Sequence, residues 1–419
     1  MLAINYKAQI FLVILILIIW CINPFLSIAA ILCVIARFML NGGVVKFFLL
    51  LIALSVGLIS YTTKSISQEE TDINRYYFVY QSFANVGSFR DFVFAIFLEG
   101  EVNPLFQSIN FLLAKTFPEN PQMLPLFWVT ITYYFSFITY YILLDICDID
   151  EKRRMVFAVA IALVGVIYFG RTTESIKQCS SAAIFGYAVA RAIMKKGKGS
   201  LFVVIAILVH ISSIILLPIY WSVNSKFIRR HLKIIFIFCF LASFIDLNKF
   251  IALIVNNVPI FPAAITDKLL TYEDYNVPSS IRLLITFFIY AILIGLLAWH
   301  YYKKKNERDK TFLIVQVVAF CILLINKSNA HNFMRYIYSY FPFIGMAYLK
   351  FSGFNNWKKN EYMVLHFVFI SFLIYSNISY LLYFTDAAGN YANSYLDNSV
   401  RNLFIYNVVD YLNYKVVIQ

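Results

Sequence analysis

Long apolar stretches alternate with short polar or basic segments along almost the whole chain. The first stretch, residues 8–38, is longer than the roughly 20 residues that one membrane-spanning helix needs. Asn23-Pro24 interrupts it, and proline ends or kinks a helix. The pattern therefore predicts two short helices or one tilted, kinked helix here. The further stretches that predict crossings are 46–61, 125–144, 155–170, 180–194, 201–221, 234–250, 281–302, 311–325, 336–349 and 362–384.

This pattern predicts an all-α, polytopic integral membrane protein with re-entrant or broken helices. Counted at roughly 20 residues a span, it has about 12 or 13 transmembrane helices. We expect a single membrane domain over residues 1–419. Two shorter pieces, 92–97 and 104–117, are partly amphipathic and fit interfacial or re-entrant helices better than spans.

Lysine and arginine gather in the segments 195–199, 225–233, 301–310 and 350–359. Short loops rich in these residues stay in the cytoplasm. If 201–221 crossed the membrane once, 225–233 would lie outside, against its charge. We therefore expect 201–221 to enter the membrane and fold back at His210-Ile211-Ser212-Ser213. The alternative is that 201–221 spans the membrane once and that one neighbouring crossing is miscounted. The outward-facing parts are then about 62–120, 248–280, 326–335 and the tail 385–419.

The amino-acid composition supports a membrane protein. Hydrophobic residues make up 61% of the chain and charged residues 14%, against roughly 25% charged residues in soluble domains. The formal net charge of +13 could indicate nucleic-acid binding, but it lies in short loops between apolar spans, where membrane topology explains it. The six cysteines stand mostly alone and form no CxxC pair, so neither a disulfide framework nor a zinc site is indicated.

Polar chemistry concentrates on the outward-facing side. Arg171, Glu174, Lys177 and Gln178 recur at three- and four-residue spacing. They would share one face of a helix, with two cations flanking one carboxylate at a membrane entrance. His210 stands in an almost wholly apolar stretch, where an ionisable group is by default a candidate functional residue. The other outward groups are Asp72 with Arg75, Glu99 with Glu101, Arg282, and Arg335 at the end of 329–335.

Several cations on one membrane-level face fit a diphosphate group. Guanidinium and ammonium groups make short, charge-assisted hydrogen bonds to phosphoryl oxygens and stabilise a departing diphosphate. Tyr76, Tyr77 and Tyr80 offer flat faces suited to sugar rings. Transfer to a sugar hydroxyl also needs a general base, and the candidates are His210, Glu101 and Asp72.

A divalent cation is an alternative use of the carboxylates. Glu69, Glu70 and Asp72 could hold one through their oxygens. Their spacing is not specific, and we expect no metal and no cofactor. Taken singly, each polar residue could also be an ordinary interfacial anchor or a solvated loop charge.

Four short motifs carry a resemblance that covers most of the chain. They are Asp72-x-x-Arg75-Tyr76-Tyr77; Glu101 leading to Leu105, Phe106 and Asn110; Ile176-Lys177-Gln178 followed by Lys195, Lys196 and His210-x-Ser212; and Arg335 followed by Tyr336 and Tyr340. With them the chain resembles the Wzy-type O-antigen and exopolysaccharide repeat-unit polymerases, in particular their EpsG-like branch. One departure is Lys177-Gln178, where such proteins commonly have Arg-Gln. Lysine supplies the positive charge but not the two parallel hydrogen bonds of a guanidinium group. Either Arg171 contributes these hydrogen bonds, or this position contributes less to binding here.

The resemblance implies a GT-C-type glycosyltransferase at the periplasmic face of a bacterial inner membrane. It would transfer a growing glycan from undecaprenyl diphosphate onto the non-reducing sugar of a lipid-linked repeat unit, in the biosynthesis of lipopolysaccharide O-antigen or a related surface polysaccharide. Expected partners are undecaprenyl-diphosphate-linked glycans and membrane lipids, with a polysaccharide chain-length regulator as a further candidate and no nucleic acid. The catalytic candidates are His210, Glu101 and Asp72, and the substrate-binding candidates are Arg75, Tyr76, Arg171, Glu174, Lys177, Gln178, Arg282 and Arg335.

Two other classes stay open. A lipid-linked oligosaccharide flippase or another transporter would tend to show paired internal repeats and ionisable groups at the bilayer midplane. No repeat is visible in the sequence, and the ionisable groups collect at one face. A membrane O-acyltransferase is the third class, because a membrane histidine also suits acyl transfer.

Overall fold

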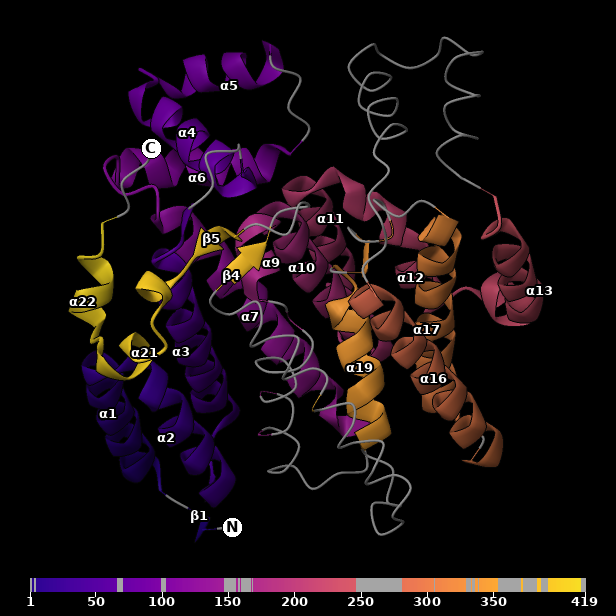
Figure 1. The fold of residues 1–419 in the computed structure, drawn as a ribbon. Helices are drawn as coiled ribbons and strands as arrows, with labels where there is room; N and C mark the ends of the chain where they lie inside the picture. Colours follow the sequence, from indigo (N-terminus) through magenta and orange to yellow (C-terminus); the bar gives the residue numbers. More distant parts are fainter. Residues whose placement is uncertain are drawn as a thin grey trace.

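The computed structural model shows a bundle of apolar helices with shorter helices lying across one end (Figure 1). Three helices in the described part of the chain are long and apolar enough to span a membrane: Gly42–Tyr61, Met123–Leu143 and Leu284–Tyr302. The described helices confirm an all-α polytopic membrane protein, while the predicted crossings at 155–170 and 362–384 lie almost wholly outside the described residues. The structure describes residues 2–3, 5–65, 71–98, 103–146, 169–245, 281–304, 306–328, 336–337, 339–352, 383–385 and 391–415, and the single residues 156, 159, 167, 333 and 371.

The first apolar stretch forms two separate helices, α1 (Tyr6–Ile22) and α2 (Pro24–Arg37). Asn23 divides them, because its backbone is extended and its Oδ1 accepts a hydrogen bond from the N–H of Leu26 at 2.7 Å. An asparagine cap followed by proline at the first helical position is a strong helix start. Of the two alternatives, the two short helices are confirmed. Both pack against α3 (Gly42–Tyr61).

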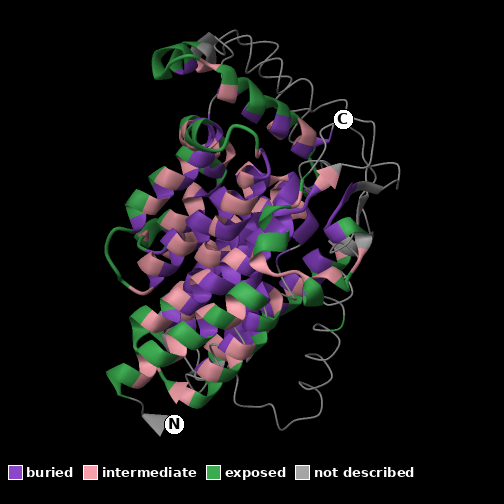
Figure 2. Ribbon diagram, turned by 90° about the vertical axis from the view of Figure 1, so that its left-hand side faces the viewer, coloured by how far each residue is buried: buried purple, intermediate pink, exposed green. Residues whose placement is uncertain are grey.

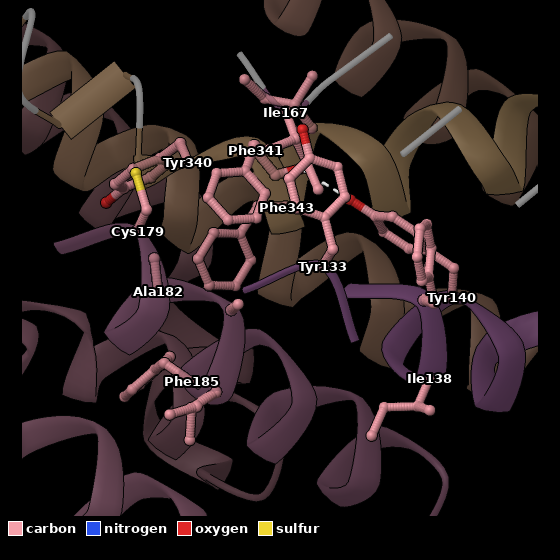
Figure 3. Close-up of a cluster of buried hydrophobic side chains, with 14 of the residues drawn as sticks. Tyr133, Ile138, Tyr140, Ile167, Cys179, Ala182, Phe185, Tyr340, Phe341 and Phe343 are labelled. Carbon is pink, nitrogen blue, oxygen red and sulfur yellow. Dashed lines mark hydrogen bonds between the residues drawn. The ribbon is translucent and has the colours of Figure 1, made fainter. Parts of the chain in front are cut away.

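The centre of the bundle is formed by α3, α7 (Met123–Leu143) and α10 (Ile176–Ile193). Buried residues lie along the middle of the bundle, and exposed residues lie along its margins and in the upper helices (Figure 2). Figure 3 shows the cluster in which Tyr133 and Tyr140 of α7 gather with Phe185 of α10 and Phe341. The Tyr140 hydroxyl donates to the main-chain oxygen of Phe341 at 3.1 Å, so α19 (Phe341–Ser352) is fastened to α7.

Helices α3 and α7 approach each other closely at Gly57. A Cβ atom at this position would lie 2.1 Å from Oγ1 of Thr130 and 2.9 Å from the main-chain oxygen of Leu126. Only a residue without a Cβ allows the two helices to pack at this distance.

The segment after α10 folds back on itself. It comprises α11 (Gly199–Val209), a 3₁₀ helix, η3 (Ile211–Leu216), and α12 (Leu217–Ser222). Between α11 and η3, His210 has extended backbone with φ −152°. A Cβ on Gly199 would lie 3.1 Å from the hydroxyl of Tyr220, so the start of α11 and the end of α12 lie side by side. The chain therefore reverses at His210 as predicted, and the entry of this segment into the membrane stays a prediction.

The basic segment 225–233 is helical and is not the loop that the sequence suggested. It forms the first turns of α13 (Lys226–Ala242), and Oγ of Ser225 caps the helix by accepting from the N–H of Ile228 at 3.2 Å. Lysine and arginine are good helix formers, so a run of them continues readily into an apolar helix. The chain turns by 112° between Ile211–Ser222 and this helix.

Three of the four basic segments meet at the end of the bundle opposite the short helices. Helix α7 leads 21 residues away from those helices, which is roughly 30 Å. Just beyond its end, the main-chain oxygen of Ile146 accepts from Nζ of Lys350 at 2.5 Å, and Nζ also pairs with Asp309 at 2.8 Å. Asp309 lies in α17 (Glu307–Ile325), which follows α16 (Ile281–Lys304), and Arg229 of α13 donates to Thr311 of α17 at 2.8 Å.

Three short helices, α4 (Asp72–Asn85), α5 (Phe89–Leu98) and α6 (Pro104–Thr116), lie across the other end, and we call them the cap (Figure 1). Aromatic rings hold the cap together. Phe92 stacks on Phe111 with a centroid distance of 4.3 Å and meets Phe83 edge to face at 5.2 Å. The pieces predicted to be interfacial or re-entrant, 92–97 and 104–117, are the second and third cap helices.

The C-terminal tail returns to the bundle and the cap. Strand β5 (Tyr391–Ser394) pairs antiparallel with both β3 (Lys64–Ser65) and β4 (Tyr383–Thr385), with Ser394 opposite Lys64. After η5 (Leu396–Asn398), the short helices α21 (Asn402–Ile405) and α22 (Val408–Leu412) pack beside α2 and α3. The remaining short elements are β1 (Leu2–Ala3), which pairs parallel with β2 (Phe38–Met39), η1 (Leu144–Ile146) and η4 (Asn326–Ser328).

Candidate functional site

Helix α9 (Phe169–Glu174) and α10 are separate helices, so the expectation of one continuous helical face is wrong. Ser175 divides them, with backbone angles φ −100° and ψ 50°. Because of this break, Glu174, Lys177 and Gln178 each reach a different set of partners.

Glu174 is a buried carboxylate that receives two hydrogen bonds. Its Oε1 accepts from the main-chain N–H of Asp72 at 2.7 Å, and its Oε2 accepts from the side-chain amide of Asn393 at 2.7 Å. Asp72 is the first residue of α4, where N–H groups lack partners within the helix and the helix dipole favours a negative charge. Glu174 therefore fastens the cap to α9 and to the tail strand.

The cations that act on the Glu174 carboxylate are not the pair that the sequence had suggested. Burial raises its pKa, and the Asn393 hydrogen bond and the charges of Arg171 and Arg75 act in the opposite direction. The two cations that act on this carboxylate are therefore Arg171 and Arg75, whereas the sequence had suggested Arg171 and Lys177. Arg75 also forms an ion pair with the carboxylate of Asp72, whose main-chain N–H binds Glu174.

Lys177 lies against aromatic rings of the cap. Its Nζ is 5.5 Å from the ring centroid of Tyr76 and 5.6 Å from that of Phe106, distances at which an ammonium group is attracted to the ring faces. Phe106 stacks on Trp128 of α7 at 4.9 Å, and Nε1 of Trp128 donates to Oδ1 of Asn110 at 2.8 Å. Residues from three of the four sequence motifs thus meet here.

The side chain of His210, which lies between α11 and η3, contacts the residue that precedes α6. Its Nδ1 is 3.2 Å from Oδ1 of Asn103, the residue before α6, and the N–H of Ile211 donates to the same oxygen at 3.1 Å. Phe106, one turn into α6, contacts Lys177. The first turn of α6 and the residue before it therefore connect His210 with Lys177.

Gln178 faces away from this group toward the fourth motif. Its Nε2 donates to Oγ of Ser339 at 3.0 Å, and Ser339 donates to the main-chain oxygen of Tyr336 at 3.0 Å. The structure thus brings the start of α10 next to the segment that follows Arg335.

Sequence analysis missed Asn393, Tyr395 and Asn103. The Tyr395 hydroxyl and Oγ1 of Thr173 are hydrogen-bonded at 2.5 Å, so the tail contacts α9 through two successive inward-facing residues of an extended chain. The density of asparagine and tyrosine in the tail was the one available signal, and it named no individual residue.

Several predicted residues lie outside the described part of the chain. These are Glu69, Glu70, Glu99, Glu101 and Arg335, together with the side chain of Arg282. Among the described residues, no group of three or more His, Cys, Asp and Glu side chains could hold a metal ion.

Fold and site together define a polytopic helical membrane protein with a charged and aromatic site between a helical cap and the bundle. The chain belongs to the EpsG family, whose family model matches residues 65–396, from the second residue of β3 to η5. Membership of this family indicates a glycosyltransferase-like polysaccharide polymerase of the membrane. Comparisons with curated proteins and with solved structures find no match.

Proposed function

We propose that this protein is a GT-C-type glycosyltransferase. It joins undecaprenyl-diphosphate-linked repeat units into lipopolysaccharide O-antigen or a related surface polysaccharide, at the periplasmic face of a bacterial inner membrane. The observation that carries the proposal is the Lys177 ammonium group on the faces of Tyr76 and Phe106, where Tyr76 belongs to the same helix, α4, as the Asp72–Arg75 ion pair.

The cations suit a diphosphate leaving group. Aromatic rings attract an ammonium group, and those of Tyr76 and Phe106 hold the Lys177 ammonium group at the base of the cap. Arg75 directly precedes Tyr76 in the chain. The charges of Arg75 and Arg171 both act on the carboxylate of Glu174. Positive groups placed in advance where a diphosphate departs stabilise its developing charge.

The reaction needs one proton acceptor. A hydroxyl of the acceptor sugar loses its proton to His210, and its oxygen forms a bond to the anomeric carbon of the donor glycan. At the same time the bond between that carbon and the diphosphate oxygen breaks. The electron pair of this bond leaves with undecaprenyl diphosphate. In this assignment Asp72 orients Arg75 through their ion pair. Glu101, outside the described residues, stays a candidate base.

The placement of the basic segments supports a periplasmic site. Three of them meet through Lys350, Asp309, Arg229 and Thr311 at the end of the bundle opposite the cap. Segments rich in lysine and arginine stay in the cytoplasm, so the cap and its site would face the periplasm.

The test is an assay with purified protein in detergent micelles and lipid-linked repeat units, read as a ladder of glycan lengths on a gel. We expect Lys177→Ala to shorten or abolish the ladder and Lys177→Arg to retain it, since arginine also stacks on aromatic rings. Arg90→Ala, which removes an exposed cation of α5, is the matched control and should leave the ladder unchanged. A normal ladder from Lys177→Ala would overturn the assignment of Lys177. No ladder from wild-type protein under any condition would favour a flippase, because micelles offer no two sides for transport.

A further inference from the structure

Asn103 occupies the capping position of α6 without capping it. Asparagine is among the preferred residues there, because its side-chain oxygen accepts from an N–H of the first turn. In this protein Asn103 precedes Pro104 and makes no such bond. Its buried Oδ1 instead faces the turn of the folded-back segment, 3.1 Å from the N–H of Ile211 and 3.2 Å from Nδ1 of His210.

The main-chain N–H of Ile211 fixes the orientation of the Asn103 amide. This N–H can only donate, so the amide atom that faces it must be the oxygen. The opposite orientation would place the amide NH₂ group against the N–H of Ile211, so that two donors would face each other and the hydrogen bond would be lost.

The same oxygen then fixes the tautomer of His210. An amide oxygen can only accept, so Nδ1 must carry the proton that it donates to Asn103. In a neutral imidazole one ring nitrogen is protonated and the other is not. Nε2 is therefore the unprotonated nitrogen of His210.

We propose that Asn103 is a positioning residue that holds His210 in the Nδ1-protonated tautomer, with Nε2 as the nitrogen that takes the acceptor hydroxyl's proton. The proposal rests on the proposed function, in which His210 is the base. The hydrogen bond between Nδ1 and Asn103 persists when Nε2 becomes protonated, because both ring nitrogens of an imidazolium are donors. The proton transfer thus requires no rearrangement at this contact.

Helix α6, which Asn103 precedes, also carries residues that contact Lys177 and the bundle. Phe106 of the same helix lies under Lys177, and Asn110 of the same helix is bound to Trp128 of α7. One helix, itself fixed to the bundle, thereby sets the base in register with the cation. A base on a folded-back segment needs such support, because rate depends steeply on sub-ångström placement.

The tautomer can be observed directly in wild-type protein. Full-length protein with ¹⁵N-labelled imidazole rings, at a pH where the imidazoles are neutral, gives separate ¹⁵N resonances for protonated and unprotonated nitrogens. The chain has five histidines, and subtraction of the His210→Gln spectrum identifies His210. We expect a protonated Nδ1 and an unprotonated Nε2. The opposite tautomer in wild-type protein would overturn the inference, whatever the activity.

Substitutions at Asn103 add a kinetic test. Asn103→Ala should mix the two tautomers and loosen the placement of the imidazole ring, and together these effects should lower kcat on the order of 10²-fold, with a smaller change in KM. Asn103→Asp keeps an acceptor oxygen at both contacts and should preserve the tautomer and most of the turnover. An unmixed tautomer in folded Asn103→Ala would overturn the role of Asn103. Normal turnover by His210→Gln would instead overturn the base assignment in the proposed function, so the two failures are distinguishable.

Discussion

The side-chain amide of Asn393 donates to the buried carboxylate of Glu174 at 2.7 Å, across 219 positions of the chain. The opposite carboxylate oxygen binds the first main-chain N–H of α4. One ionisable group thus holds the tail strand, the cap and α9 at a single point. The protonation state of Glu174 is therefore coupled to the stability of this junction.

Replacing Glu174 should change how stability depends on pH. Burial raises its pKa above the ordinary value of 4.5, so the folded protein binds this proton more tightly than the unfolded chain. The resulting contribution favours folding below about pH 4.5 and is lost as the pH rises through the folded-state pKa. Glu174→Gln removes this contribution. Its midpoint of thermal unfolding in detergent, relative to wild type, should therefore rise as the pH is raised from 4.5.

The matched control is Glu119→Gln, which neutralises an exposed carboxylate between cap and bundle. Its difference from wild type is the reference for removing a carboxylate that makes no contact at this junction. If Glu174→Gln behaved in the same way, the buried carboxylate would not be linked to folding.

The buried ion pair between Lys350 and Asp309 should depend on both partners. Their side chains are 5% and 9% exposed, and removing one partner of a buried pair leaves an uncompensated charge, which costs about 3–5 kcal/mol. Lys350→Met alone should therefore lower the unfolding midpoint strongly. Lys350→Met combined with Asp309→Leu should recover most of the loss, because the buried charge goes as well. Additive losses in the double variant would show that the two groups are not coupled.

Packing between α3 and α7 predicts a cost for one added methyl group. Gly57→Ala would place its Cβ against Thr130 and the main chain at Leu126, and relief requires the helices to shift. Overpacking of this kind costs about 1–3 kcal/mol. Gly295→Ala in α16 adds the same methyl group with nothing within 4 Å and should be neutral. Equal unfolding midpoints for the two variants would contradict the close approach at Gly57.

The orientation of the bundle can be tested with two single cysteines in a variant without native cysteines. Gln81→Cys lies on an exposed position of the cap, and Asn224→Cys is exposed beside the basic start of α13 without disturbing the Ser225 cap. A membrane-impermeant thiol reagent added from the periplasm should label Gln81→Cys and leave Asn224→Cys unlabelled until the membrane is opened. Labelling of Asn224→Cys in intact cells would reverse the proposed orientation.

The sequence predicted those features that depend on local pattern. The length of the apolar stretches located α3, α7 and α16. The requirement that all basic segments lie on one side of the membrane predicted the fold-back at His210. The break at Ser175 was not predictable, because serine carries no strong helix-stop signal and the divergence of Glu174 and Lys177 is set by distant partners. Asn393 was equally inaccessible, since its pairing depends on long-range contacts that leave no periodicity in the sequence.

The tail strand imposes an order of events during synthesis. At about 5–20 residues per second, Asn393 leaves the ribosome roughly 10–40 s after Glu174, given their separation of 219 residues. During that interval the bundle can already lie in the membrane, while the Glu174 carboxylate beside Arg75 and Arg171 lacks its amide partner. The junction between the cap, α9 and the tail strand is therefore completed only after Asn393 has been made.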